Sequence, residues 1–181
     1  MRFISFVLAV VVVGALVVVG LAFVGSPAAS CADGTIATSS AAEASFNAKW
    51  NAFEAAARRG EAATASFTEE ELTSRGARYL ADLNVPARNL QVHLCAGQSK
   101  GQAVANVQVL GVARDIVVTG HLQSETGGSR IVLDGVQVGL VPDVVGATMV
   151  NSVLSVANIR ASIEIPEVAT TSTTATIKGK K

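Results

Sequence analysis

Hydrophobic and polar positions alternate with a helical period just after residue 40. Between residues 41 and 62 the side chains of Phe46, Trp50, Phe53 and Ala57 recur at intervals of three and four positions. This spacing places them on one face of a helix. The segment therefore predicts an amphipathic helix whose aromatic face packs on the rest of the domain, with a resting place on a membrane surface as the alternative.

A second helix is predicted within residues 65–86. Thr68 and Glu71 have the spacing of a capping box, in which each residue satisfies the backbone N–H of the other at the start of a helix. Pro86 would end this helix, because the residue before a proline disfavours helical geometry. Its predicted buried face consists of Leu72, Tyr79, Leu80 and Leu83.

The hydrophobic period changes to two between residues 89 and 141. Four alternating runs are separated by short glycine-containing turns, and no helical pattern lies between them, so we expect consecutive antiparallel strands. Glycines inside the runs indicate bulges or bends, which would curve the sheet strongly. The apolar positions include Leu90, Val92, Leu94, Val107, Ile116, Val118, Leu122, Val132, Val136, Val138 and Leu140.

Residues 142–159 form an unusually apolar segment. After Asp143 the next charged residue is Arg160, and Pro142 suits the first turn of a helix. The abundance of valine would also allow a strand, but the length and the period favour a helix. A helix without a charged stripe needs burial to be stable.

The carboxyl-terminal part contains shorter apolar patterns. The run NIRASIEIP predicts a strand that includes Ile163 and Ile165 and ends at Pro166. Residues 175–178 predict either one last short strand or a frayed end.

The amino-terminal residues 1–25 predict a membrane segment. Residues 3–24 carry no charge and as a helix would extend about 33 Å, which is enough to cross a bilayer core. Arg2 would remain in the cytoplasm, and the domain would lie outside it. A signal anchor is favoured over a cleaved signal peptide, which would give a secreted protein. Residues 26–40 are small and polar and predict a linker.

The chain has two cysteines, Cys31 and Cys95, and three states are open to them. Outside the cytoplasm they could form a disulfide. They could equally be two unrelated thiols. In a lipoprotein Cys31 would carry a lipid, because residues 28–31 loosely match a lipobox, and the disulfide would then be excluded.

Composition and motifs limit the functional classes. Fourteen basic and fourteen acidic residues give zero net charge, which argues against nucleic-acid binding. The sequence lacks the common nucleophile, phosphate-loop and metal motifs, so we expect no enzyme, no cofactor and no metal. His93 and His121 occupy polar positions in different strands and are expected to be surface histidines. Hydrolysis would need His93 to share a cleft with an acid.

The order of these elements resembles bacterial envelope proteins that look like single modules of the TULIP (tubular lipid-binding) superfamily. The matching features are Thr68 to Leu72, Val136 to Gly139 and Pro142 with the segment behind it. The resemblance implies an α+β fold for residues 65–178. In that fold a curved antiparallel sheet wraps around a long apolar helix, and lipid acyl chains occupy the groove between them.

The resemblance therefore implies a membrane-anchored, extracytoplasmic domain that binds or transfers a membrane lipid. The alternative is the same fold with a solid core and no ligand, which would dock an envelope protein. The residues expected to contact lipid are Val145, Met149, Val150, Val153 and Leu154 on the helix, and Val136 and Val138 on the facing strand.

Overall fold

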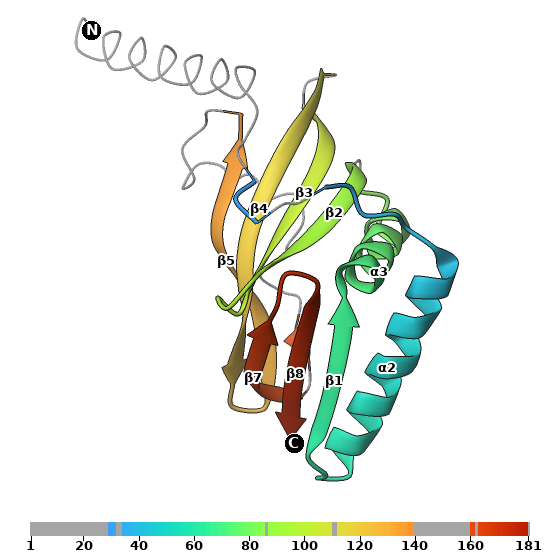
Figure 1. Cartoon of the computed structure of the whole chain (residues 1–181), viewed down its shortest axis with the longest axis vertical. Coiled ribbons are helices and arrows are strands. Elements are labelled where there is room, and N and C mark those ends of the chain that lie inside the picture. Colours follow the sequence, from blue (N-terminus) through green and yellow to red (C-terminus); the bar gives the residue numbers. More distant parts are fainter. Residues whose placement is uncertain are drawn as a thin grey trace, which may run out of the picture.

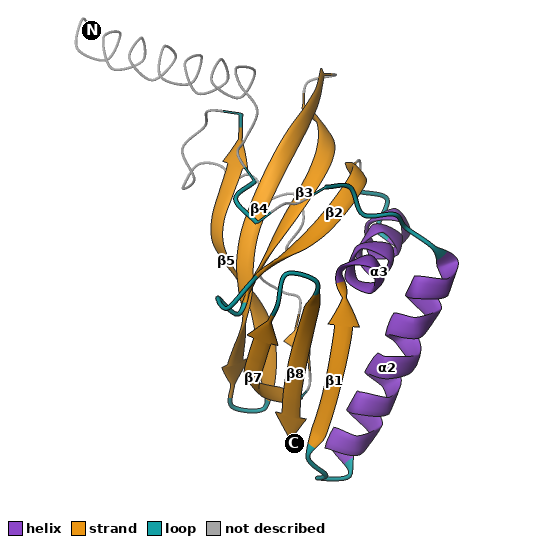
Figure 2. Ribbon diagram, in the orientation of Figure 1, coloured by secondary structure: helices purple, strands orange, loops and turns teal. Residues whose placement is uncertain are grey.

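The computed structural model of the chain describes residues 29–31, 34–85, 87–109, 112–139, 160–161 and 163–180. These residues form an α+β fold with two helices and two antiparallel sheets (Figures 1 and 2). None of the helices in these ranges has the length and apolar character needed to span a bilayer. The predicted membrane segment at residues 1–25 and the predicted apolar helix at residues 142–159 lie outside the described residues.

Both helices begin at a side-chain cap, and the sequence predicted the one at Thr68. Helix α2 spans Ser40–Arg58, and the Ser39 side chain accepts the backbone N–H of Ala42 at its start. Helix α3 spans Glu69–Asp82 and has the predicted capping box between Thr68 and Glu71. Both helix predictions are confirmed. The caps stabilise the helix starts because they satisfy backbone N–H groups that have no partner within the helix.

The predicted buried face of α3 is correct only in part. Leu72 and Leu80 are half-buried, and Leu72 packs against the core. However, Tyr79 and Leu83 are 38% and 52% exposed, whereas the buried residues are the polar Glu71, Thr73 and Ser74. Helix α3 lies beside an edge strand, and its polar side chains accept the free N–H groups of that edge. Thr73 Oγ1 accepts from Val92 and Glu69 Oε1 accepts from Leu94. Hydrogen bonding to the strand edge therefore decides which face is buried.

A three-stranded sheet has the order β1-β8-β7. Strand β8, Thr174–Lys180, lies in its centre, so the last short strand forms rather than frays. Strand β1, Ala63–Thr68, was not predicted, although every second residue in it is buried. Two of its three buried residues are alanines, Ala63 and Ala65, which give a weak hydrophobic signal.

Strand β7, Glu164–Thr170, continues through Pro166, so the prediction that this proline ends the strand is wrong. Pro166 has no N–H to donate, and proline in a sheet is restricted to edges and bulges. Pro166 lies at both an edge and an irregularity, because β7 is an edge strand and its register with β8 shifts between Glu164 and Glu167.

The other sheet has five strands in the order β2-β3-β4-β5-β6. Consecutive antiparallel pairing confirms the prediction from the period of two. A register shift between Thr119 and Gly120 agrees with the expectation that glycines mark bulges. The strands are β2 Ala87–Cys95, β3 Lys100–Val109, β4 Val112–Glu125, β5 Gly128–Val138 and β6 Arg160–Ala161.

The main core of the described residues lies between α2 and the three-stranded sheet. Figure 1 shows α2 running beside β1, and α3 beside β2. The prediction that the aromatic face of α2 packs on the domain is confirmed, because Phe53 is buried there and Phe46 and Trp50 pack against it. No long apolar helix wrapped by sheet is present in the described ranges. The buried members are Phe53, Ala57, Ala63, Ala65, Phe67, Ile163, Ile165 and Ile177.

Candidate functional site

One face of the five-stranded sheet is mostly apolar, with Arg114 lying opposite Val107 on the same face. Residues directly opposite each other in antiparallel strands place their side chains on the same face. One cross-strand row joins Ala103, Val118 and Val136, and the next joins Ala105, Ile116 and Val138. Further apolar side chains on this face belong to Val92, Leu94, Val107, Leu122, Ile131 and Leu133.

The two predicted lipid-contacting residues of β5 lie on this apolar face. Val136 is 0% and Val138 is 1% exposed, and their row neighbours on β3 and β4 are half-buried. The five residues predicted on the apolar helix lie outside the described residues; they are Val145, Met149, Val150, Val153 and Leu154. Val136 and Val138 are therefore buried members of a group of adjoining apolar side chains.

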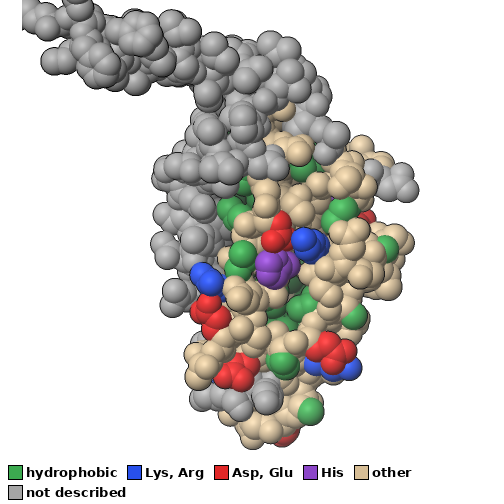
Figure 3. All heavy atoms as spheres, turned by 90° about the vertical axis from the view of Figure 1, so that its left-hand side faces the viewer, with side chains coloured by type: hydrophobic (Ala, Val, Ile, Leu, Met, Phe, Trp, Pro, Cys, Tyr) green, Lys and Arg blue, Asp and Glu red, His purple; other side chains and the backbone are tan. Residues whose placement is uncertain are grey.

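The opposite face of the same sheet, which we call the polar face, carries polar side chains together with Val104, Val117 and Val132, and Val117 is buried. Lys100 lies opposite His121, and Gln102 lies opposite Thr119. Gln102 Nε2 donates to Thr119 Oγ1 at 3.1 Å. Figure 3 shows basic, acidic and histidine side chains adjoining one another on the side of the molecule that it draws. Mixed charge of this kind gives no single-sign patch for an ionic partner.

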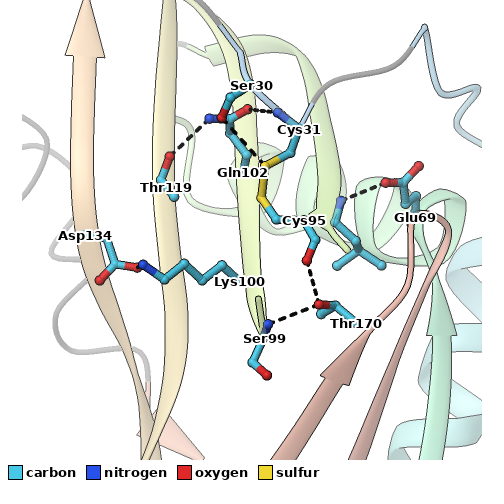
Figure 4. The surroundings of a disulfide bond; sticks show 11 residues. Ser30, Cys31, Glu69, Cys95, Ser99, Lys100, Gln102, Thr119, Asp134 and Thr170 are labelled. Atoms are coloured by element: carbon cyan, nitrogen blue, oxygen red, sulfur yellow. Dashed lines mark hydrogen bonds and ion pairs between the residues drawn. A yellow bond between two sulfur atoms is a disulfide. The ribbon is translucent and has the colours of Figure 1, made fainter. Parts of the chain in front are cut away.

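The described residues 29–31 and 34–39, which we call the strap, cross this polar face. Cys31 forms a disulfide with Cys95 at the end of β2, and their Cα atoms are 5.1 Å apart (Figure 4). The backbone N–H of Cys31 also donates to Gln102 Oε1 at 3.1 Å. The pairing that the sequence left open is therefore present, and a sulfur in this bond cannot also carry the lipid of a lipoprotein.

The disulfide lies where the strap and both sheets meet. The carbonyl of Cys95 accepts a hydrogen bond of 2.7 Å from the Thr170 hydroxyl of β7, as Figure 4 shows. Thr170 Oγ1 in turn accepts the N–H of Ser99 at 3.1 Å, and Ser99 Oγ donates to the carbonyl of Val168. These bonds fasten the β2–β3 turn to the three-stranded sheet.

His93 is buried, which contradicts the prediction of a surface histidine. It is 2% exposed, and its Nδ1 atom has no hydrogen-bond partner among the described residues. The alternation along β2 places His93 between Gln91 and Cys95 on one face, and the strap is attached to both of them. The strap thus covers a position that would otherwise face water.

His121 pairs with an acid on the polar face. Its Nδ1 atom lies 3.0 and 3.1 Å from the two carboxylate oxygens of Asp134, and Lys100 Nζ lies 3.3 Å from the same carboxylate. Partial burial raises the pKa of Asp134, but hydrogen bonds from His121 and Lys100 outweigh it and lower the pKa overall. The hydrolase alternative required His93 to lie beside an acidic residue. In the structure it is His121 that lies beside one, Asp134.

A separate open hollow of about 580 Å³ lies between α2 and β1. Its lining is mostly alanine, including Ala56, Ala63 and Ala65, with Lys49 among the lining residues. In the described part of the chain no three histidine, cysteine or carboxylate side chains are grouped to hold a metal ion.

No family model, curated protein or solved structure matches this chain.

Proposed function

We propose that this protein is a membrane-anchored, extracytoplasmic module that holds or transfers a membrane lipid. The lipid would lie in an apolar groove between the sheet and the segment 142–159. The observation that carries the proposal is the apolar face of the five-stranded sheet, with its rows through Val136 and Val138. An acyl chain forms no hydrogen bonds, so a surface of aliphatic side chains suits it.

The sizes of the side chains support a groove. Ala103 and Ala105 occupy the β3 positions of the two rows, and valine or isoleucine occupies the rest. Short side chains on a curved sheet leave space above the backbone that a ligand can fill. The proposed contacts are Val136 and Val138 together with Val145, Met149, Val150, Val153 and Leu154.

Two features support an extracytoplasmic location. The uncharged segment 3–24 has the length of a membrane anchor. The Cys31–Cys95 disulfide is of the kind that persists in oxidising compartments and is rare in the cytosol.

A second candidate function is a ligand-free interaction domain that docks an envelope protein. The near-complete burial of Val136 and Val138 favours it, because a surface already covered by protein has less room for lipid. The two candidates therefore differ in one property, which is whether the apolar face contacts lipid or only protein.

Lipid analysis of a secreted form tests the proposal. A chain that begins at residue 26 keeps the strap and the disulfide. We expect organic extraction and mass spectrometry to recover lipid in near-stoichiometric amounts. Ala105→Phe should reduce the bound lipid strongly by filling the groove. Gln108→Phe is the matched control, because Gln108 is exposed on the opposite face of β3. Wild-type protein that folds without lipid would support the interaction domain instead.

A further inference from the structure

The strap is held along its length, although its small polar composition predicts a flexible linker. The disulfide holds it at Cys31, and the side chain of Gln91 pairs with the backbone of Ile36. At its end the N–H of Ser39 donates to Ser74 Oγ of α3 at 3.1 Å. Three attachments to β2 and α3 leave little freedom between the domain and the start of the strap.

The free length of chain that remains before the strap is short. The predicted membrane segment has its last long apolar residue at Val24, and Ala29 is the first described residue of the strap. Five residues reach at most about 18 Å when fully extended. Helix α2 alone, with 19 residues, is about 28 Å long. Because this connection is shorter than helix α2, it restricts how far the domain can rotate relative to the membrane.

We propose that the disulfide-fastened strap fixes the orientation of the domain on the membrane. The exposed part of the polar face, which includes Asp115, is presented to the bilayer surface, and the turn between α2 and β1 points away from it. Figure 1 shows the strap, in blue, crossing the half of the molecule opposite to that turn. This inference rests on the membrane anchor of the proposed function and does not depend on bound lipid.

The chemistry of the presented face fits contact with lipid headgroups. Asp115 is exposed on the same face of β4 as Thr119, and Lys100, His121 and Asp134 form a paired cluster beside them. Polar and mutually neutralised side chains suit a hydrated zwitterionic surface, because they need no insertion into the hydrocarbon. The apolar face lies on the other side of the sheet, so this contact does not involve the proposed lipid groove.

Energy transfer to lipid headgroups tests the orientation in the full chain. The described structure has no free cysteine, so Asp115→Cys and Glu61→Cys each add one thiol for a donor dye. Both positions are exposed, and Glu61 follows the turn after α2. The labelled proteins are reconstituted in phosphatidylcholine vesicles that contain a headgroup-linked acceptor. Resistance to carbonate extraction shows whether the chain is inserted.

We expect clearly higher transfer efficiency at residue 115 than at residue 61. Adding Cys31→Ser, Cys95→Ser and Gln91→Ala releases the strap, and the difference between the two positions should then be lost. Equal efficiencies with the strap intact would overturn the proposal. So would a difference that survives release of the strap, or a chain that does not stay in the vesicles. Lipid content, measured separately on the secreted form, reports on the proposed groove alone.

Discussion

The side-chain amide of Gln91 pairs with the backbone of Ile36 in the way that a neighbouring strand would. Gln91 Oε1 accepts the Ile36 N–H, and Gln91 Nε2 donates to the Ile36 carbonyl at 3.2 Å. One side chain thus satisfies both polar backbone groups of a residue in the strap. The consequence is an ordered connection at a place where the composition indicates a loose one.

Replacing Gln91 should loosen the strap. Gln91→Ala removes both hydrogen bonds and is expected to lower the free energy of unfolding by about 1–2 kcal/mol. Limited proteolysis should then cut within residues 34–39 faster than in the wild type. Urea titration and mass analysis of the fragments measure the two effects. The control is Gln98→Ala in the exposed β2–β3 turn, and an equal effect there would contradict the specific pairing.

The disulfide should contribute strongly to stability. Cys31 and Cys95 are 64 positions apart, and a cross-link over such a loop typically stabilises a protein by about 2–4 kcal/mol. We expect Cys31→Ser with Cys95→Ser to lower the free energy of unfolding by that amount in urea. In the wild type, alkylation should add no label before reduction and two labels after it. A lipid-modified Cys31 in the intact mass spectrum would contradict the disulfide.

Glu71 should make stability depend on acid pH. Burial raises the pKa of its carboxyl, but hydrogen bonds from Lys49 Nζ, Ser45 Oγ and the Thr68 N–H outweigh it and lower the pKa overall. A lowered pKa contributes stability above the unfolded value of about 4.3, and this contribution is lost as the pH falls through the folded value.

The matched variant for this prediction is Glu71→Gln, which keeps the size of the side chain and removes its charge. We expect it to lower the free energy of unfolding at pH 7 by about 1–3 kcal/mol, since hydrogen bonds to a charged group are the stronger kind. The difference in the free energy of unfolding between wild type and variant should narrow below about pH 4. Urea titrations at a series of pH values measure this difference, and a difference that stays constant with pH would contradict the role of the charge.

Gly179 should not tolerate a side chain. A Cβ atom at this position of β8 would collide with the ring of Phe53 from α2. Both residues are buried. We expect Gly179→Ala to lower the free energy of unfolding by about 1–3 kcal/mol through overpacking. The double variant with Phe53→Leu should lose less unfolding free energy than the sum of the losses in the two single variants. Strict additivity would indicate that the ring of Phe53 does not cause the loss at Gly179.

Local sequence determines much of the secondary structure. The capping residue Thr68 locates the start of α3, because a cap is satisfied within a few residues. The spacing of Phe46, Trp50, Phe53 and Ala57 identifies α2, because it depends only on the helical period. Alternation along residues 89–138 predicts the antiparallel strands and the shared face of Val136 and Val138, since successive side chains in a strand point to opposite faces. It does not predict that the register shift near Gly120 turns Val132 to the other face, opposite His121.

Tertiary structure decides what depends on partners distant in the chain. The alternation makes His93 a polar position, but the strap covers it. The helical period predicts that Tyr79 is buried, but Tyr79 is exposed because Thr73 and Glu69 of α3 face the edge of β2 and accept its N–H groups. Pro166 remains within a strand because β7 lies at a sheet edge. The linker becomes a strap only because Cys95, Gln91 and Ser74 lie within its reach in the folded chain, and no local pattern encodes that proximity.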